Sequence, residues 1–83
     1  MSETASANER VIHVKEIDPQ HRHAVLFHLF ENLAPDASLQ LVVDHDPRPL
    51  RFQLEAKHGG HCRWTYLEQG PERWRVRLQN GRG

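Results

Sequence analysis

An alternating apolar run that leads into an Asp-Pro pair occurs twice in this chain, and this feature constrains the fold most. The first run spans residues 11–15 and precedes Asp18-Pro19, and the second spans residues 38–44 and precedes Asp46-Pro47. Strict alternation is typical of a half-buried strand. Aspartate is a favoured N-cap residue, and proline is favoured at the first helical position. The two runs therefore predict two successive strand–helix units.

The two predicted helices differ in how clearly the sequence marks them. The first runs from Pro19 to about Leu33 and has one face at helical spacing, made by His23, Leu26, Phe27, Phe30 and Leu33. The second runs from Pro47 to about Lys57. Residues 50–56 also alternate as a strand would, but the prolines at the start and Gly59-Gly60 after the end favour a helix.

Two further strands complete the predicted fold. Residues 62–68 and 72–79 alternate on either side of Gln69-Gly70-Pro71, which predicts a hairpin with a core face that includes Trp64, Tyr66 and Trp74. The element order is βαβαββ. This order predicts an α/β (α+β) two-layer sandwich, in which two helices cover one face of a four-stranded mixed sheet.

The length allows one small domain. Eighty-three residues lie near the lower limit at which a hydrophobic core holds a fold without disulfides or metals. We expect a single domain over residues 11–79. Residues 1–10 are predicted to be a disordered lead-in, and residues 80–83 a flexible tail.

Composition excludes several classes of partner. Acidic and basic residues number 11 each, so the net charge is zero with neutral histidines, which argues against nucleic acid or an anionic membrane. The N-terminus lacks a signal-peptide pattern, and no apolar run approaches the roughly 20 residues that span a bilayer. With Cys62 as its one cysteine, the chain is expected in the cytoplasm. The seven histidines could reflect a metal site, a response to pH or composition alone.

Several phrases of the sequence occur together in one family. They are Arg22-His23, residues 27–30 and 33–35, DHDPRPL at residues 44–50 and WTYLEQGPERWRV at residues 64–76. In these phrases the chain resembles the domain of unknown function 2249 family of small bacterial domains. The resemblance implies the TusA-like (SirA-like) fold and the strand order 1-2-4-3. Family members occur alone, in tandem, or joined to hemerythrin-like or cupin domains, which implies protein partners of those kinds and a link to metal, oxygen or nitric oxide physiology.

The same fold group includes sulfur carriers, in which a cysteine precedes a proline at the start of the first helix. This chain has Asp18-Pro19 at the matching place, and a carboxylate cannot carry a sulfane sulfur. Cys62 lies on the predicted third strand, so the carrier role does not transfer to it. The resemblance implies the fold, and it leaves a sulfur or redox carrier without the usual cysteine as one alternative function.

Polar side chains follow both of the first two strands at the point where each strand ends. Because parallel strands joined by a crossover end on the same side of the sheet, we expect these side chains to form one site. Its members are Asp18, His21, His23, Asp44, His45, Asp46 and Arg48. His45 and Asp44, together with His21 or His23, would suit zinc or iron(II). Two helix N-termini at the same corner would suit an anion.

The same residues also have plain structural roles. Asp18 and Asp46 stand where N-caps are expected, each worth about 1 kcal/mol. Asp44 and His45 could bond to the turn or pair with a neighbouring arginine. His23 falls on the apolar face of the first helix, where a histidine is usually a core residue.

A second candidate surface is the open face of the sheet. Basic residues alternate outward there, namely Lys15, Arg63, Arg73, Arg75 and Arg77. Such a face could contact phosphates or an acidic protein, although it lacks exposed aromatic residues that stack on bases. Alternatively, it is a solvated face that discourages sheet-on-sheet association.

The sequence shows no nucleophile beside a base and no glycine-rich phosphate loop, so no enzymatic activity is expected. We predict a non-catalytic binding or adaptor module that contacts another protein through the corner of Asp18 and His45. One alternative is a metal-binding accessory protein, and a second is the sulfur or redox carrier described above. The oligomeric state does not follow from these patterns.

Overall fold

The computed structural model describes residues 9–81. The main elements are β1 (Arg10–His13), α1 (Arg22–Glu31), β2 (Ser38–Val43), α2 (Arg48–His58), β3 (Cys62–Gln69) and β4 (Trp74–Asn80). Three single turns of 3₁₀ helix join them, η2 (Val14–Glu16), η3 (Pro19–His21) and η4 (Gly59–His61). No helix within residues 9–81 is long and apolar enough to cross a membrane.

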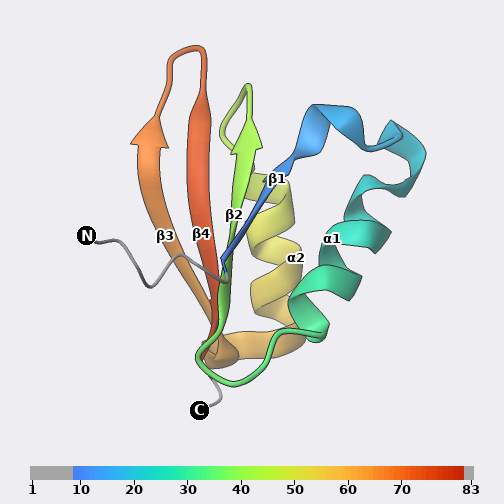
Figure 1. Ribbon diagram of the computed structural model, residues 1–83, viewed down its shortest axis with the longest axis vertical. Coiled ribbons are helices and arrows are strands. Elements are labelled where there is room, and N and C mark those ends of the chain that lie inside the picture. The colour runs from blue at the N-terminus through green and yellow to red at the C-terminus, as the bar shows by residue number, and fades with distance from the viewer. Residues whose placement is uncertain (1–8, 82–83) are drawn as a thin grey trace.

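The four strands form one mixed sheet in the order β1-β2-β4-β3. β1 and β2 are parallel, whereas β4 pairs antiparallel with both β2 and β3. Both helices lie on the same side of this sheet (Figure 1). The βαβαββ two-layer sandwich is confirmed, and the strand order agrees with the order that the family resemblance implied.

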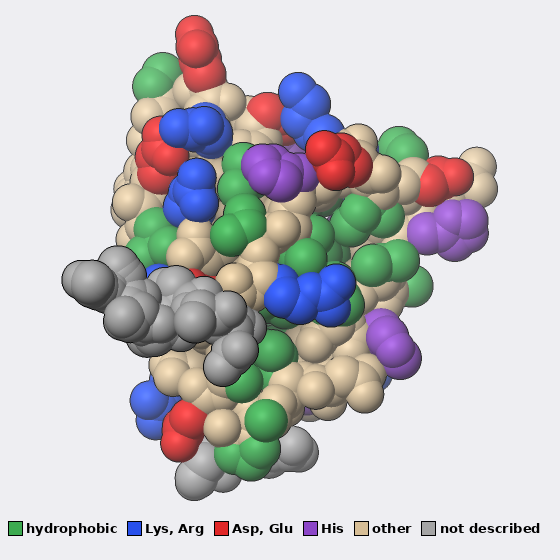
Figure 2. All heavy atoms as spheres, viewed as in Figure 1, with side chains coloured by type: hydrophobic (Ala, Val, Ile, Leu, Met, Phe, Trp, Pro, Cys, Tyr) green, Lys and Arg blue, Asp and Glu red, His purple; other side chains and the backbone are tan. Residues whose placement is uncertain are grey.

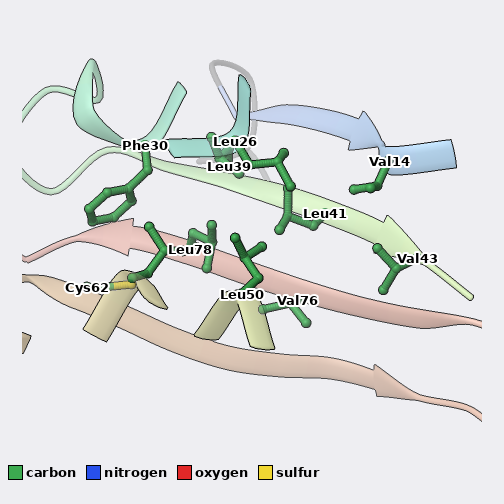
Figure 3. Packing of buried hydrophobic residues seen from close by; sticks show 11 residues of the cluster. Val14, Leu26, Phe30, Leu39, Leu41, Val43, Leu50, Cys62, Val76 and Leu78 are labelled. Carbon is green, nitrogen blue, oxygen red and sulfur yellow. The ribbon is translucent and has the colours of Figure 1, made fainter. Parts of the chain in front are cut away.

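The core lies between the sheet and the two helices. Alternation along β2 and β4 turns every second side chain toward the helices, and each helix contributes buried residues from one face (Figure 3). The buried apolar residues of these four elements are Leu26, Phe30, Leu39, Leu41, Val43, Leu50, Leu54, Val76 and Leu78. Trp64, Tyr66 and Trp74 of the hairpin pack half-buried against them. Full burial of one such aliphatic side chain is worth about 1.5–3 kcal/mol.

The first strand is shorter than the alternation predicted. It ends at His13, and residues 14–16 turn into a 3₁₀ helix that buries Val14. The guanidinium of Arg22 holds this turn, because its Nε donates to the carbonyl of Ile17 at 2.9 Å and its Nη2 to the carbonyl of Lys15 at 3.4 Å. Lys15 therefore lies in the turn and not on a strand.

The first predicted helix is divided into two parts. Residues 19–21 form a 3₁₀ turn, and α1 spans only residues 22–31. Asn32 ends α1 because both its backbone amide and its side-chain amide donate to the carbonyl of His28, at 3.1 and 2.8 Å. His23 is exposed in the first turn, so its prediction as a core residue was wrong. The helix reaches the core only one turn later, at Leu26.

The described structure extends past residues 11–79 at both ends. Arg10 belongs to β1, and Glu9 bonds to the sheet through its carboxylate. Asn80 ends β4 and is buried, its side chain donating to the carbonyl of Leu33 at 2.9 Å. The predictions of a disordered lead-in and a flexible tail otherwise fall on residues 1–8 and 82–83, which lie outside the described region.

Candidate functional site

The ends of β1 and β2 form one corner with the beginnings of α1 and α2, as the parallel pairing requires. A groove of about 230 Å³ lies at this corner. Its lining comes from four segments of the chain and comprises Val14, Pro19, Arg22, His23, Leu26, Val43, His45, Pro47, Pro49 and Leu50. Figure 3 shows Val14 and Val43 at the same end of the sheet. The corner predicted from the sequence is therefore formed as one continuous surface.

The floor of the groove is apolar and rigid. Val14, Leu26, Val43 and Leu50 line it and are otherwise buried in the core. Three prolines stand in the walls, and proline fixes the backbone angle φ. The recess is therefore preformed, because neither the packed floor nor the proline walls can relax easily.

His45 and Asp44 form an exposed pair beside the groove. The Nδ1 atom of His45 lies 2.7 Å from the Oδ1 atom of Asp44. The hydrogen bond from His45 holds the pKa of Asp44 below its usual range. An ionised carboxylate only accepts hydrogen bonds, so we assign the proton to Nδ1. In the neutral ring, Nε2 of His45 is then left as an acceptor toward solvent or a ligand.

Asp18 is an N-cap, as predicted. Its Oδ1 accepts a hydrogen bond from the backbone amide of Gln20 at 3.0 Å, and its Oδ2 lies 3.8 Å from Nδ1 of His21. Both side chains are exposed at the start of the turn that leads into α1. Their role in the structure is to begin that turn, and neither lines the groove.

Asp46 does not cap α2, so that prediction was wrong. The N-cap position is occupied by Pro47, and Asp46 accepts a hydrogen bond from the hydroxyl of Tyr66 at 2.7 Å. It also pairs with Nε of Arg48 at 3.3 Å. Asp46 therefore links the loop before α2 to strand β3, and Arg48 pairs with the same carboxylate. No local sequence pattern indicates Tyr66 as the partner of Asp46, because the two residues lie 20 positions apart.

The candidate metal ligands His21, His23, Asp44 and His45 do not form a cluster in the described part of the chain. Within residues 9–81, no group of three or more histidine, cysteine, aspartate or glutamate side chains could hold a metal ion. His45 is paired with Asp44, and His21 is paired with Asp18. His23 faces the groove among apolar neighbours.

The family described as "Uncharacterized conserved protein (DUF2249)" matches residues 11–80. The chain belongs to this family. The resemblance seen in DHDPRPL and the hairpin segment is thus confirmed, while membership of the TusA-like fold group stays a prediction. No curated protein and no solved structure matched the chain significantly.

Cys62 of this DUF2249 domain lies far from the corner. It is opposite Asn80 at one end of the hairpin, whereas Val43 at the groove is opposite Trp74 at the other end. Burial raises the pKa of the Cys62 thiol to about 11. The group is therefore protonated at neutral pH, which disfavours the thiolate chemistry that a sulfur carrier needs.

Carboxylates offset part of the positive charge on the open face of the DUF2249 sheet. Nε and Nη2 of Arg77 donate to the two carboxylate oxygens of Glu9 at 2.7 and 3.1 Å. Burial alone would raise the pKa of Glu9, but hydrogen bonds from Arg77, Ser38 and Gln40 outweigh it and lower this pKa to about 2. Glu9 is therefore a buried counter-charge within the sheet face, with its side chain only 4% exposed.

The positive charges of Arg73 and Arg75 are also partly offset by a carboxylate. Nε of Arg73 donates to the carboxylate of Glu68 at 3.2 Å, and Nε of Arg75 lies 4.0 Å from the same oxygen. A bulge between Tyr66 and Glu68 brings this carboxylate opposite Arg75. Acidic and basic side chains lie next to one another in Figure 2. Arg63 is exposed near the other end of the hairpin, opposite Gln79. Arg73, Arg75 and Arg77 thus share two carboxylates, Glu68 and Glu9, and the alternation in the sequence does not reveal these partners.

Proposed function

We propose that this DUF2249 domain is a non-catalytic protein-binding module, and that its corner groove receives one apolar side chain of a partner protein. The observation that carries the proposal is the size and lining of the groove. Pockets for small molecules usually measure about 300–1,000 Å³, and this groove measures about 230 Å³. It is thus better matched to a single side chain than to a whole cofactor.

The groove has the composition of a small interface. Its floor is apolar, and His23 and His45 stand at its rim. Interfaces between proteins commonly combine an apolar centre with a polar rim. A leucine side chain that is fully buried contributes about 1.5–3 kcal/mol. One anchor therefore supports weak, reversible binding, to which contacts around the rim would add.

Two alternative functions have less support. A metal-binding accessory protein would need further ligands beside Asp44 and His45, supplied from outside the described residues. A sulfur carrier would need a reactive thiol, and Cys62 is buried with a raised pKa. The association with hemerythrin-like or cupin domains stays a prediction about the kind of partner.

The test is a titration with two acetylated peptides, Gly-Ser-Gly-Ser-Leu and Gly-Ser-Gly-Ser-Ser, followed by methyl NMR of the domain. We expect the leucine peptide to shift the methyl signals of Leu26, Val43 and Leu50, which line the groove. If the anchor contributes about 2 kcal/mol, the serine peptide binds about 30-fold more weakly.

A variant that fills the groove provides the control on location. His45→Trp places an indole at the rim, and binding of the leucine peptide should be lost. His28→Trp makes the same exchange at an exposed position of α1 outside the groove lining, and binding should be kept. Equal binding by both variants, or methyl shifts confined to other residues, would contradict the proposal.

A further inference from the structure

We propose that the groove recognises the C-terminal residue of a partner chain, with the apolar side chain on the floor and the terminal carboxylate on Arg22. This inference rests on the proposed function, because it names the part of the partner that enters the same groove. It adds an electrostatic requirement that an apolar anchor alone does not have.

Arg22 is the one lining residue of the groove with a fixed charge, and no aspartate or glutamate belongs to that lining. Its guanidinium is half-buried and held in place by the carbonyl oxygens of Ile17 and Lys15. Arginine has five N–H donors, and these contacts use two of them. The remaining donors belong to a group that is already oriented, so a ligand need not order it on binding.

The charge of Arg22 is not balanced within the described part of the chain. No carboxylate of residues 9–81 forms an ion pair with it, whereas Arg48 pairs with Asp46 and Arg77 with Glu9. Two predicted acids of the corner, Asp18 and Asp44, have other partners. Asp18 accepts from the amide of Gln20, and Asp44 accepts from His45. A carboxylate from a partner is the complement that this charge lacks.

A chain terminus fits better than an acidic side chain because of the size of the groove. A volume of about 230 Å³ takes one residue, and a C-terminal residue carries both the apolar side chain and the carboxylate on the same Cα atom. Capture of a terminal carboxylate is a known mode of peptide recognition. An internal acidic residue would have to place its carboxylate from a neighbouring position, because its own Cα atom carries no apolar side chain.

The experiment compares three acetylated peptides by NMR titration of the wild-type domain. They are Gly-Ser-Gly-Ser-Leu with a free carboxylate, the same peptide as its C-terminal amide, and Gly-Ser-Gly-Asp-Leu as its amide. Hydrogen bonds to charged groups contribute about 1.5–3 kcal/mol. We therefore expect the first amide to bind about 10- to 150-fold more weakly than the free acid, and the aspartate in the third peptide not to restore the loss.

Two variants test whether Arg22 is the group that binds the terminal carboxylate. Arg22→Gln should abolish the difference between acid and amide, whereas Arg48→Gln, at an exposed arginine outside the lining, should keep it. Arg22→Gln also removes two hydrogen bonds to the turn after β1 and could change the structure of that turn. The comparison of the acid and amide peptides on the wild-type domain is therefore the primary test. Equal binding of acid and amide in the groove would overturn this inference and leave the proposed function intact. Restoration by aspartate would also overturn it, and no binding of any peptide would contradict both proposals.

Discussion

Replacement of Glu9 by glutamine removes a negative charge that four side-chain hydrogen bonds hold on the open face of the sheet. The carboxylate accepts from Arg77 at 2.7 and 3.1 Å, from Ser38 at 2.5 Å and from Gln40 at 2.8 Å. These bonds lower its pKa from 4.5 to about 2. One pKa unit corresponds to roughly 1.36 kcal/mol, so this lowering of the pKa corresponds to about 3 kcal/mol of stabilisation of the folded state. Since the side chain is 4% exposed, solvent screens the interaction little, and Glu9→Gln should lower the free energy of unfolding by about 2–3 kcal/mol at pH 7.

The pH dependence follows from the direction of the pKa shift. Because the pKa of Glu9 is lower in the folded state, its stabilisation is complete above about pH 4.5 and is lost as the pH falls toward 2. The pKa values of Glu31 and Asp44 are also lowered in the folded state. Wild type and the Glu9→Gln variant therefore both lose some stability in acid. The difference between wild type and Glu9→Gln isolates Glu9, and it should shrink to near zero at pH 2.

The assay is urea denaturation at pH 7, 4.5, 3 and 2, followed by tryptophan fluorescence. Glu72→Gln is the matched control, because Glu72 is exposed in the hairpin turn and a surface change there should stay within about 0.5 kcal/mol. Free energies of unfolding that agree for Glu9→Gln and wild type at pH 7 would refute the assignment of Glu9 as the counter-charge of Arg77. A difference that persists unchanged at pH 2 would refute the electrostatic explanation.

Three other predictions concern the loop before α2, the buried thiol and the groove. Tyr66→Phe removes the donor to Asp46 and should lower the free energy of unfolding by about 1 kcal/mol in urea; no change would show that the bond does not hold the loop. Cys62 should resist iodoacetamide at pH 7.5 in the native protein and react readily in urea, because the native thiol is buried with a raised pKa; rapid native labelling would contradict this. In the groove, His45→Trp should abolish binding of the leucine peptide that His28→Trp retains.

The order of elements could be predicted because its signals are local. The Asp-Pro corners, the alternation of β2 and the glycines after Lys57 each lie within a few residues of the feature that they mark. Boundaries were less accurate where a polar side chain decides them. Asn32 ends α1 by bonding to a carbonyl, and Asn80 extends β4 by bonding to Leu33. Neither bond belongs to a periodic pattern.

The corner itself could be predicted, because chain topology brings the ends of β1 and β2 together. The roles of individual residues were not predictable in the same way. Asp46 accepts a hydrogen bond from Tyr66 instead of capping α2. Arg77 pairs with Glu9, which lies 68 positions away in the sequence. No sequence pattern places Arg22 in the groove, because its position depends on how the turn after β1 folds back.

The central claim is that the corner groove holds an apolar side chain of a partner protein. The most direct test is a search for intermolecular NOEs between the leucine methyl groups of the free-acid peptide and the methyl groups of Leu26, Val43 and Leu50. We predict NOEs to these groups, which line the groove, and their loss in His45→Trp. NOEs directed instead to Phe52 or Leu67, which are 64% and 40% exposed on other surfaces, would contradict the claim.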